Sequence, residues 1–189
     1  MAPKKRRYGW RRDVPDMRDA RLHLSPEQVV RVFPATHSLR PMMPEIDNQT
    51  GLGACTAHSI KGLLQYREMT DENHGRLVVP SRLFVYYNSR ILEGTVREDS
   101  GVSIRNAIKA VVKWGVCDEA MWGYSDLKEM FTKRPPQECY DLARKYRVTT
   151  YGRVKQGLLD LKAHLFLGDP VAFGFAVYDS FENDETAKT

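Results

Sequence analysis

The stretch EIDNQTGLGACTAHSIKGLLQY, residues 45–66, decides the fold of this chain. It places Cys55 behind a Gly-x-Gly-Ala turn at the start of an amphipathic helix, with Gln49 six residues upstream. A thiol at a helix N-terminus faces unpaired backbone N–H groups and the positive end of the helix dipole, and both favour the thiolate form. Gln49 offers a side-chain amide that can donate a hydrogen bond nearby. A thiolate beside a donor is the minimal set of groups for attacking a carbonyl and stabilising the resulting oxyanion.

Apolar residues at helical spacing predict that most of the chain is helical. The first helix is expected over residues 54–69, with an apolar face made of Ala57, Ile60, Leu63, Leu64 and Met69. A second buried element over residues 78–92 should become helical after Pro80, with Ser81 near its start. The same patterns predict helices over residues 103–115, 137–147 and 154–168, and mostly loop over residues 117–136.

The two ends of the chain lack helical periodicity. Residues 1–35 predict an irregular lead-in, apart from a short capped helical turn that starts at Ser25. Residues 169–178 are apolar throughout and predict a buried strand, in which Gly174 permits close packing. A lone strand cannot satisfy its own backbone groups, so this strand needs partners from the lead-in or from residues beyond the chain.

The net charge of +5 is concentrated in a basic tail. Six Lys and Arg residues lie within the first twelve positions, and the rest of the chain has 23 basic against 24 acidic residues. We interpret the tail as a solvated terminus, with a nucleic-acid contact or a localisation signal as the alternatives. A near-neutral body argues against nucleic acid as the main partner.

Composition also bounds the cellular setting and the cofactors. No apolar run approaches 18 residues and no apolar stretch follows the basic N-terminus, so neither a membrane span nor a secretory signal is expected. Cys55, Cys117 and Cys139 are widely spaced and form no CxxC pair, which favours a reduced, cytoplasmic environment. His58 follows Cys55 by three residues, but no second close ligand pair accompanies them. We expect no metal and no organic cofactor.

Five segments in order resemble the papain-like cysteine peptidases, in the branch found in bacteria and viruses. Around the cysteine, Gln49, Gly53 and Cys55 fall on the family positions for the oxyanion-hole Gln, a Gly two residues before the nucleophile, and the nucleophile. The resembling segments are SLRPMMPEIDNQ (38–49), NQTGLGACTAHS (48–59), PSRLFVYYNSR (80–90), EDSGVSIRNAIKAVVKWGVCDEAMWGY (98–124) and GDPVAFGFAVYDSF (168–181).

The resemblance implies an α+β, papain-like fold. We expect a basic lead-in or short pro-like segment over residues 1–35, a helical lobe with the nucleophile over 36–150, and the start of an incomplete β-rich lobe over 151–189. In the family, the catalytic His and its orienting Asn follow the first strand of the second lobe. No such segments occur here, and His58 is expected to be a core histidine rather than a base.

The resemblance also assigns roles to individual residues. Cys55 is expected as the nucleophile and Gln49 as an oxyanion-hole donor, with Gly53, Ala54, Ser100 and Gly101 binding the substrate. The implied function is hydrolysis of peptide or protein substrates, with little activity in the isolated chain because the base is missing. The alternative is a non-catalytic remnant or peptide-binding pseudoenzyme, and a Cys-dependent acyltransferase would use the same local chemistry.

Overall fold

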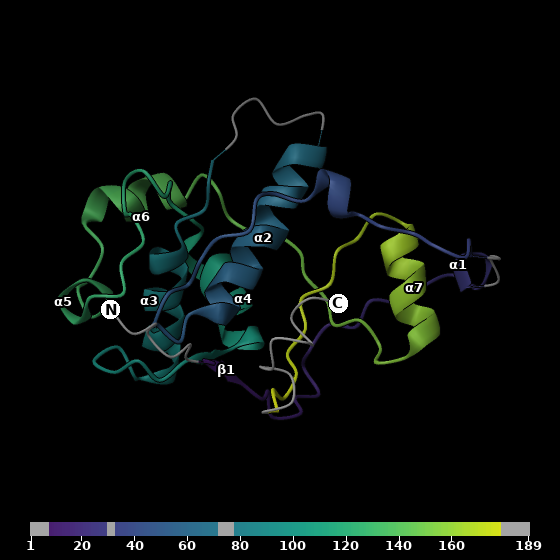
Figure 1. Cartoon of the computed structure of the whole chain (residues 1–189), viewed down its shortest axis with the longest axis horizontal. Coiled ribbons are helices and arrows are strands. Elements are labelled where there is room, and N and C mark those ends of the chain that lie inside the picture. The colour runs from purple at the N-terminus through teal and green to yellow at the C-terminus, as the bar shows by residue number, and fades with distance from the viewer. Residues whose placement is uncertain (1–7, 30–32, 72–77, 179–189) are drawn as a thin grey trace.

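The computed structural model describes residues 8–29, 33–71 and 78–178 of the chain. Three helices lie at its centre, α2 (Cys55–Thr70), α3 (Arg82–Glu93) and α4 (Ile104–Trp114). Helix α3 packs against both α2 and α4, as Figure 1 shows. The smaller elements are α1 (Pro26–Val29), the 3-10 helix η1 (Arg40–Met42), α5 (Lys128–Phe131), α6 (Gln137–Ala143) and α7 (Leu158–Phe166).

Local signals in the sequence set the ends of the central helices. The Ser81 hydroxyl caps α3 by accepting the N–H of Phe84 at 3.1 Å, and Ser103 caps α4 by accepting the N–H of Asn106 at 3.3 Å. Helix α3 ends at Gly94, whose φ of 71° is the left-handed conformation that glycine adopts without strain. The three helices predicted around residues 54–69, 80–92 and 103–115 are confirmed.

The core lies where these three helices meet. Ala57 and Ile60 of α2 are buried in it, and Leu63 and Leu64 pack against its edge, as their spacing predicted. Met69 was predicted on the same face but is half exposed, because the last turn of α2 extends past its neighbours (Figure 1). Residues 116–143, in loops and in α5 and α6, cover the other side of the core.

The lead-in is more ordered than its sequence suggested. Strand β1 (Trp10–Arg11) pairs in parallel with β2 (Val102–Ser103), directly before α4. The prediction of an irregular segment is therefore wrong at this point, because two residues are too few to show a strand periodicity. The capped turn at Ser25 is confirmed, since its hydroxyl accepts the Gln28 N–H and the Gln28 side chain accepts the Ser25 N–H.

The predicted strand over residues 169–178 does not form. This segment contains no helix or strand, with Phe173 71% exposed and Phe175 51% exposed. Among the described residues no strand pairs with it, and such a segment needs partners to satisfy its backbone groups. Gly174 still makes a close approach, because a Cβ there would lie 2.1 Å from the Trp10 ring.

Helix α7 begins at Leu158, four residues later than predicted. Residues 154–157 are not helical, because Arg153 just before them pairs with Arg21 of the lead-in and the Gly157 N–H donates to the Lys155 carbonyl at 2.8 Å in a tight turn. Helices α7 and α1 pack together at some distance from the three-helix centre (Figure 1).

None of the described helices has the length and apolarity to cross a bilayer. The boundaries at residues 35 and 150 stay predictions, and residues 179–189 lie outside the described part.

Candidate functional site

Cys55 is the first residue of α2 and is partly exposed. The turn before it is held by two backbone hydrogen bonds, from Leu52 N–H to Gln49 O at 3.4 Å and from Ala54 N–H to Leu52 O at 2.8 Å. Within the described residues, the Cys55 thiol has no hydrogen-bond partner. The start of a 16-residue helix therefore presents an accessible sulfur.

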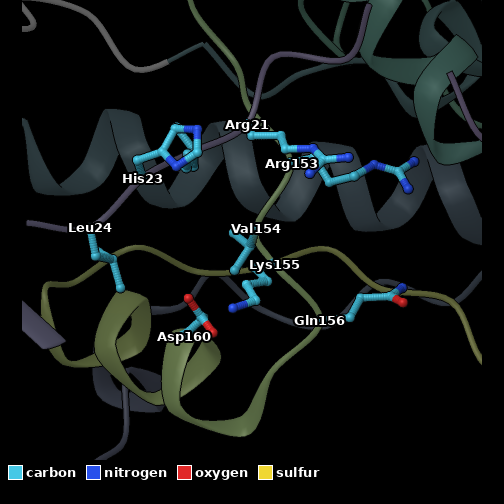
Figure 2. A pocket seen from close by; sticks show the side chains of 9 residues that line it. Arg21, His23, Leu24, Arg153, Val154, Lys155, Gln156 and Asp160 are labelled. Atoms are coloured by element: carbon cyan, nitrogen blue, oxygen red, sulfur yellow. The ribbon is translucent and has the colours of Figure 1, made fainter. Parts of the chain in front are cut away.

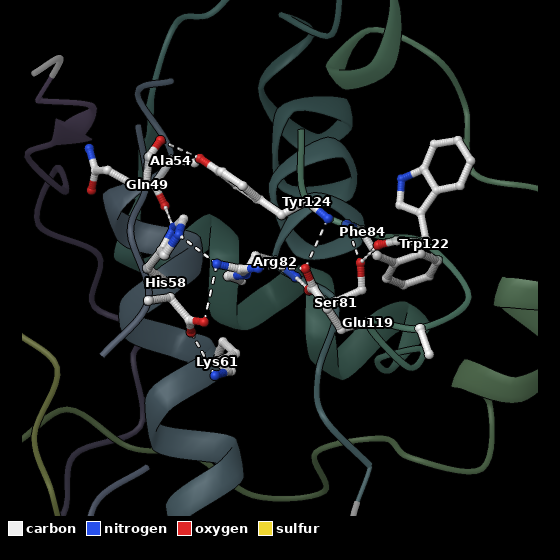
Figure 3. A network of polar contacts seen from close by, with 12 residues as sticks. Gln49, Ala54, His58, Lys61, Ser81, Arg82, Phe84, Glu119, Trp122 and Tyr124 are labelled. Carbon is white, nitrogen blue, oxygen red and sulfur yellow. Dashed lines mark hydrogen bonds and ion pairs between the residues drawn. The ribbon is translucent and has the colours of Figure 1, made fainter. Parts of the chain in front are cut away.

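Gln49 lies at the other end of the same turn. Its side-chain amide donates to the Leu52 carbonyl at 3.3 Å, and its own carbonyl accepts the Tyr124 hydroxyl at 2.7 Å (Figure 3). Both the side chain and the backbone carbonyl of Gln49 are therefore held in place.

A carboxylate and a phenol connect the Cys55 turn to the loop before β2. The Gly53 N–H donates to both oxygens of Asp99, at 3.0 and 3.1 Å. The Tyr86 hydroxyl donates to Asp99 at 2.5 Å and accepts the Gly101 N–H at 3.1 Å. Burial, followed by the Asp99 interaction, raises the pKa of the Tyr86 phenol, so it stays protonated and can donate. Gly53 and Gly101, both predicted to bind substrate, are thereby held by one network.

The other two residues predicted to bind substrate have local partners. Ala54 is buried, and its carbonyl accepts both the backbone N–H and the ring Nδ1–H of His58. Ser100 lies in the loop before Gly101, where its hydroxyl contacts Thr95 Oγ1 at 2.7 Å and Gly101 O at 2.9 Å. Both residues lie beside the network but direct these polar groups into the protein.

The lead-in covers the two glycines of this network. A Cβ on Gly9 would lie 1.7 Å from the Gly53 carbonyl oxygen, and a Cβ on Gly101 would lie 1.9 Å from the Gly9 carbonyl oxygen. The Gly9 carbonyl also accepts the Val102 N–H at 2.9 Å. Three backbones therefore meet with no space for a side chain, and Gly9 occupies the surface of Gly101 that was predicted to face a substrate.

His58 lies one turn after Cys55, and its ring is fixed on both nitrogens (Figure 3). Nδ1 lies 3.0 Å from Ala54 O and Nε2 lies 3.5 Å from Arg82 Nη1, while Tyr124 packs edge-on at 4.9 Å between ring centroids. These partners fit a neutral ring that donates from Nδ1 and accepts at Nε2. Burial lowers the pKa of His58, which also favours the neutral form.

Arg82 ties His58 to a cluster of charged residues between α2, α3 and the loop before α5. It pairs with Asp47 at 3.2 Å and with Glu119 at 2.7 Å, and Lys61 pairs with Asp47 at 2.6 Å. Figure 3 shows Arg82 lying between His58 and Glu119. Because every charge in the cluster has a partner of opposite sign, the cluster anchors residues 47–49 to the helices.

The remaining chemistry-bearing residues lie elsewhere. Cys117 and Cys139 are completely buried, and burial raises the pKa of both thiols. His164 contacts Asp169 at 3.4 Å and His37 contacts the Leu165 carbonyl, both near α7, while His74 lies outside the described residues. Among the described residues, no group of three or more His, Cys, Asp or Glu is arranged to hold a metal ion.

Sequence reasoning identified the turn but missed the side chains that hold it. The sequence patterns did not single out Asp99, Tyr86 or Tyr124 as residues that hold the site. Both tyrosines are largely buried, yet each uses its hydroxyl to hold a residue of the site. The signal available in the sequence was weak: a buried tyrosine hydroxyl needs a hydrogen-bond partner, but nothing indicates which one.

No family model matches the chain, but a viral protein and solved structures are similar to it. The chain is 34% identical, over an alignment of 209 positions, to "Uncharacterized peptidase C1-like protein L477" of Acanthamoeba polyphaga mimivirus. This alignment covers 97% of the chain and 66% of the viral protein.

Two solved structures share the fold. Xylellain, a cysteine protease from Xylella fastidiosa, superposes with a TM-score of 0.77 at 33% identity, over 89% of this chain and 66% of that one. The procathepsin B S9 of Trypanosoma congolense superposes with a TM-score of 0.59 at 18% identity, over 79% of this chain and 53% of that one. The second likeness concerns the fold alone. The chain spans just under two thirds of the length of the viral protein and of xylellain.

Proposed function

We propose that this chain, which belongs to the papain-like (C1-like) cysteine peptidase family, supplies the nucleophile and the oxyanion hole for peptide-bond hydrolysis. Cys55 is the proposed nucleophile, and the side-chain amide of Gln49 and the Cys55 backbone N–H are the proposed oxyanion donors. The observation that carries the proposal is the partly exposed thiol at the first residue of α2, next to a turn that also holds Gln49.

The proposed reaction follows from these positions. The Cys55 thiolate attacks the scissile carbonyl carbon, a C–S bond forms, and the carbonyl electrons move to oxygen. The two donors then stabilise the oxyanion. Removing one such donor typically lowers the reaction rate by about 10²–10³. Collapse of the intermediate breaks the C–N bond, leaves a thioester on Cys55 and releases the amine, which takes a proton from a general acid. Water then attacks the thioester, the C–S bond breaks, and the carboxylic acid and the free thiol are released.

The described residues do not provide the general acid and base that this reaction needs. His58 uses both ring nitrogens, towards Ala54 and Arg82, and the other described histidines lie away from Cys55. Losing one member of a nucleophile–base pair typically lowers the rate by about 10⁴ or more. We therefore propose that residues 1–189 alone cleave peptides slowly or not at all.

Labelling with an irreversible epoxide-type thiol inhibitor tests the proposed nucleophile. At neutral pH, mass spectrometry of the digested chain should find the label on Cys55 and not on Cys117 or Cys139, which are buried. Gln49→Ala should slow labelling, and Cys55→Ala should abolish it. Labelling of Cys55 at the rate of a free cysteine in the urea-unfolded chain would refute an activated thiol.

A peptide-binding pseudoenzyme is the second candidate, and the engagement of both His58 nitrogens favours it. The two candidates differ in turnover. If the labelled site belongs to a peptidase, a longer form of the protein with a histidine in reach should cleave a fluorogenic peptide, and Cys55→Ala should abolish this cleavage. If it belongs to a pseudoenzyme, the peptide should bind without cleavage, and Cys55→Ala should leave the binding affinity unchanged.

A further inference from the structure

A cavity of about 380 Å³ lies between the lead-in and the segment before α7, and no residue of the Cys55 turn lines it (Figure 2). Its walls come from residues 21–24 and 153–156, and Asp160 in the first turn of α7 closes one side. Two backbone hydrogen bonds hold the walls together: Leu22 N–H donates to Arg153 O at 3.0 Å, and Arg153 N–H donates to Ala20 O at 2.7 Å. The cavity is therefore built from two distant parts of the sequence.

Basic side chains dominate the polar part of the lining. Arg21, His23, Arg153 and Lys155 line the cavity together with a single carboxylate, that of Asp160. Arg21 and Arg153 occupy paired positions of a β-bridge, and their side chains extend in the same direction in Figure 2. Two guanidinium groups thus start from neighbouring positions, and their mutual repulsion favours anionic partners: Asp13 and Asp19 for Arg153, and an added anion for Arg21.

Only one of these basic residues is neutralised by the protein. Arg153 lies 3.2 Å from Asp19 and 3.6 Å from Asp13. Within the described residues, Arg21, His23 and Lys155 form no ion pair, although Lys155 and Asp160 point towards one another in Figure 2. The cavity therefore has an excess of positive charge in a protein body that is otherwise close to neutral.

The rest of the lining is apolar. Leu22, Leu24 and Val154 contribute aliphatic surface beside the cationic groups. Gly152 allows this arrangement, since a Cβ there would lie 2.5 Å from the Leu22 side chain. Sites for small organic molecules typically have volumes of roughly 300–1,000 Å³ and combine apolar walls with a few polar groups. The cavity falls within that class.

We propose that this cavity binds a small organic anion in which a phosphate group is attached to an apolar or aromatic body. Phosphate is favoured over carboxylate because it carries up to two charges and several acceptor oxygens, which Arg21 and Lys155 can share. The body of the ligand packs against the aliphatic wall. The bound anion joins the lead-in to residues 153–156, and the proposal does not depend on the peptidase function.

Calorimetric titration of the full chain with three matched probes tests the site. Phenyl phosphate should bind about tenfold or more tightly than inorganic phosphate, because its phenyl ring buries apolar surface against the aliphatic wall. Benzyl alcohol, which lacks the charge, should not bind measurably. Equal affinities for phenyl phosphate and inorganic phosphate, or no binding of either at millimolar concentration, would overturn the proposal.

Paired charge variants locate the binding. Arg21→Gln with Lys155→Gln should weaken phenyl phosphate binding at least tenfold, with an unchanged circular dichroism spectrum. Arg144→Gln with Lys145→Gln removes the same charge from an exposed site outside the cavity and should leave affinity within twofold. Deletion of residues 1–7 should also leave it unchanged. Equal losses in the two pairs, or loss on deletion of the tail, would overturn the proposal.

Discussion

Tyr86→Phe tests whether one hydroxyl holds the site together. The substitution keeps a completely buried ring in place and removes only the oxygen between Asp99 and Gly101. A hydrogen bond to a charged group contributes about 1.5–3 kcal/mol, and leaving a buried N–H unsatisfied costs about 1–3 kcal/mol. Since Asp99 keeps the Gly53 N–H, we expect the free energy of unfolding to fall by about 2–4 kcal/mol.

Urea unfolding followed by fluorescence measures this loss, and Tyr87→Phe is the matched control. Tyr87 is the next residue on α3 and is also buried, but its hydroxyl has no hydrogen-bond partner in the described part of the chain. We expect the control to lose less than about 0.5 kcal/mol. The alkylation rate of Cys55 should change in Tyr86→Phe alone, because Gly53 precedes the thiol. A loss below about 1 kcal/mol, or one equal to the control, would refute this reasoning.

Three further predictions concern other parts of the site. Deleting residues 1–12 should speed alkylation of Cys55 by iodoacetamide or a peptide-like inhibitor, because Gly9 covers the backbone of Gly53 and Gly101; an unchanged rate would show that the lead-in does not restrict access. The pKa of His58 is lower in the folded chain than in the unfolded chain. As the pH drops below about 6.5, the unfolded chain therefore takes up a proton that the folded chain does not, and the free energy of unfolding should fall. His58→Gln should flatten that part of the pH–stability curve measured by thermal unfolding, and an identical slope in both proteins would contradict it. Arg90→Met should lower the free energy of unfolding by about 3 kcal/mol or more, since Arg90 is buried and donates to four backbone carbonyls, whereas the exposed Arg144→Met should cost less than about 0.5 kcal/mol in the same urea assay.

The parts of the fold that followed from the sequence are those with local causes. The ends of α3 and α4 depend on Ser81, Ser103 and Gly94, which act within one turn of their own positions. The relation of Cys55 to Gln49 is equally local, because one tight turn connects them. Residue spacing therefore carries this information directly.

The parts that could not be predicted depend on contacts between distant segments. The pairing of Trp10 with Val102 has no periodic signal, since each strand contains two residues. Asp99 reaches Gly53 across 46 positions, and an aspartate in a loop has many possible partners. The failed strand over residues 169–178 shows the converse case: an apolar run indicates burial only where partners exist to cover it.

The contacts that hold the lead-in to the rest of the protein differ in strength along its length. Its strongest attachment is Arg105, whose side chain donates to both oxygens of Asp19 at 2.8 and 2.6 Å, with both side chains 12% exposed. Residues 8–11 are held by a two-residue strand and by the ion pair of Arg11 with Glu93, in which Arg11 is half exposed. Bidentate, shielded pairs are stronger than exposed ones. We therefore expect the segment over Gly101 to separate more easily than the segment around Asp19, without unfolding of α4.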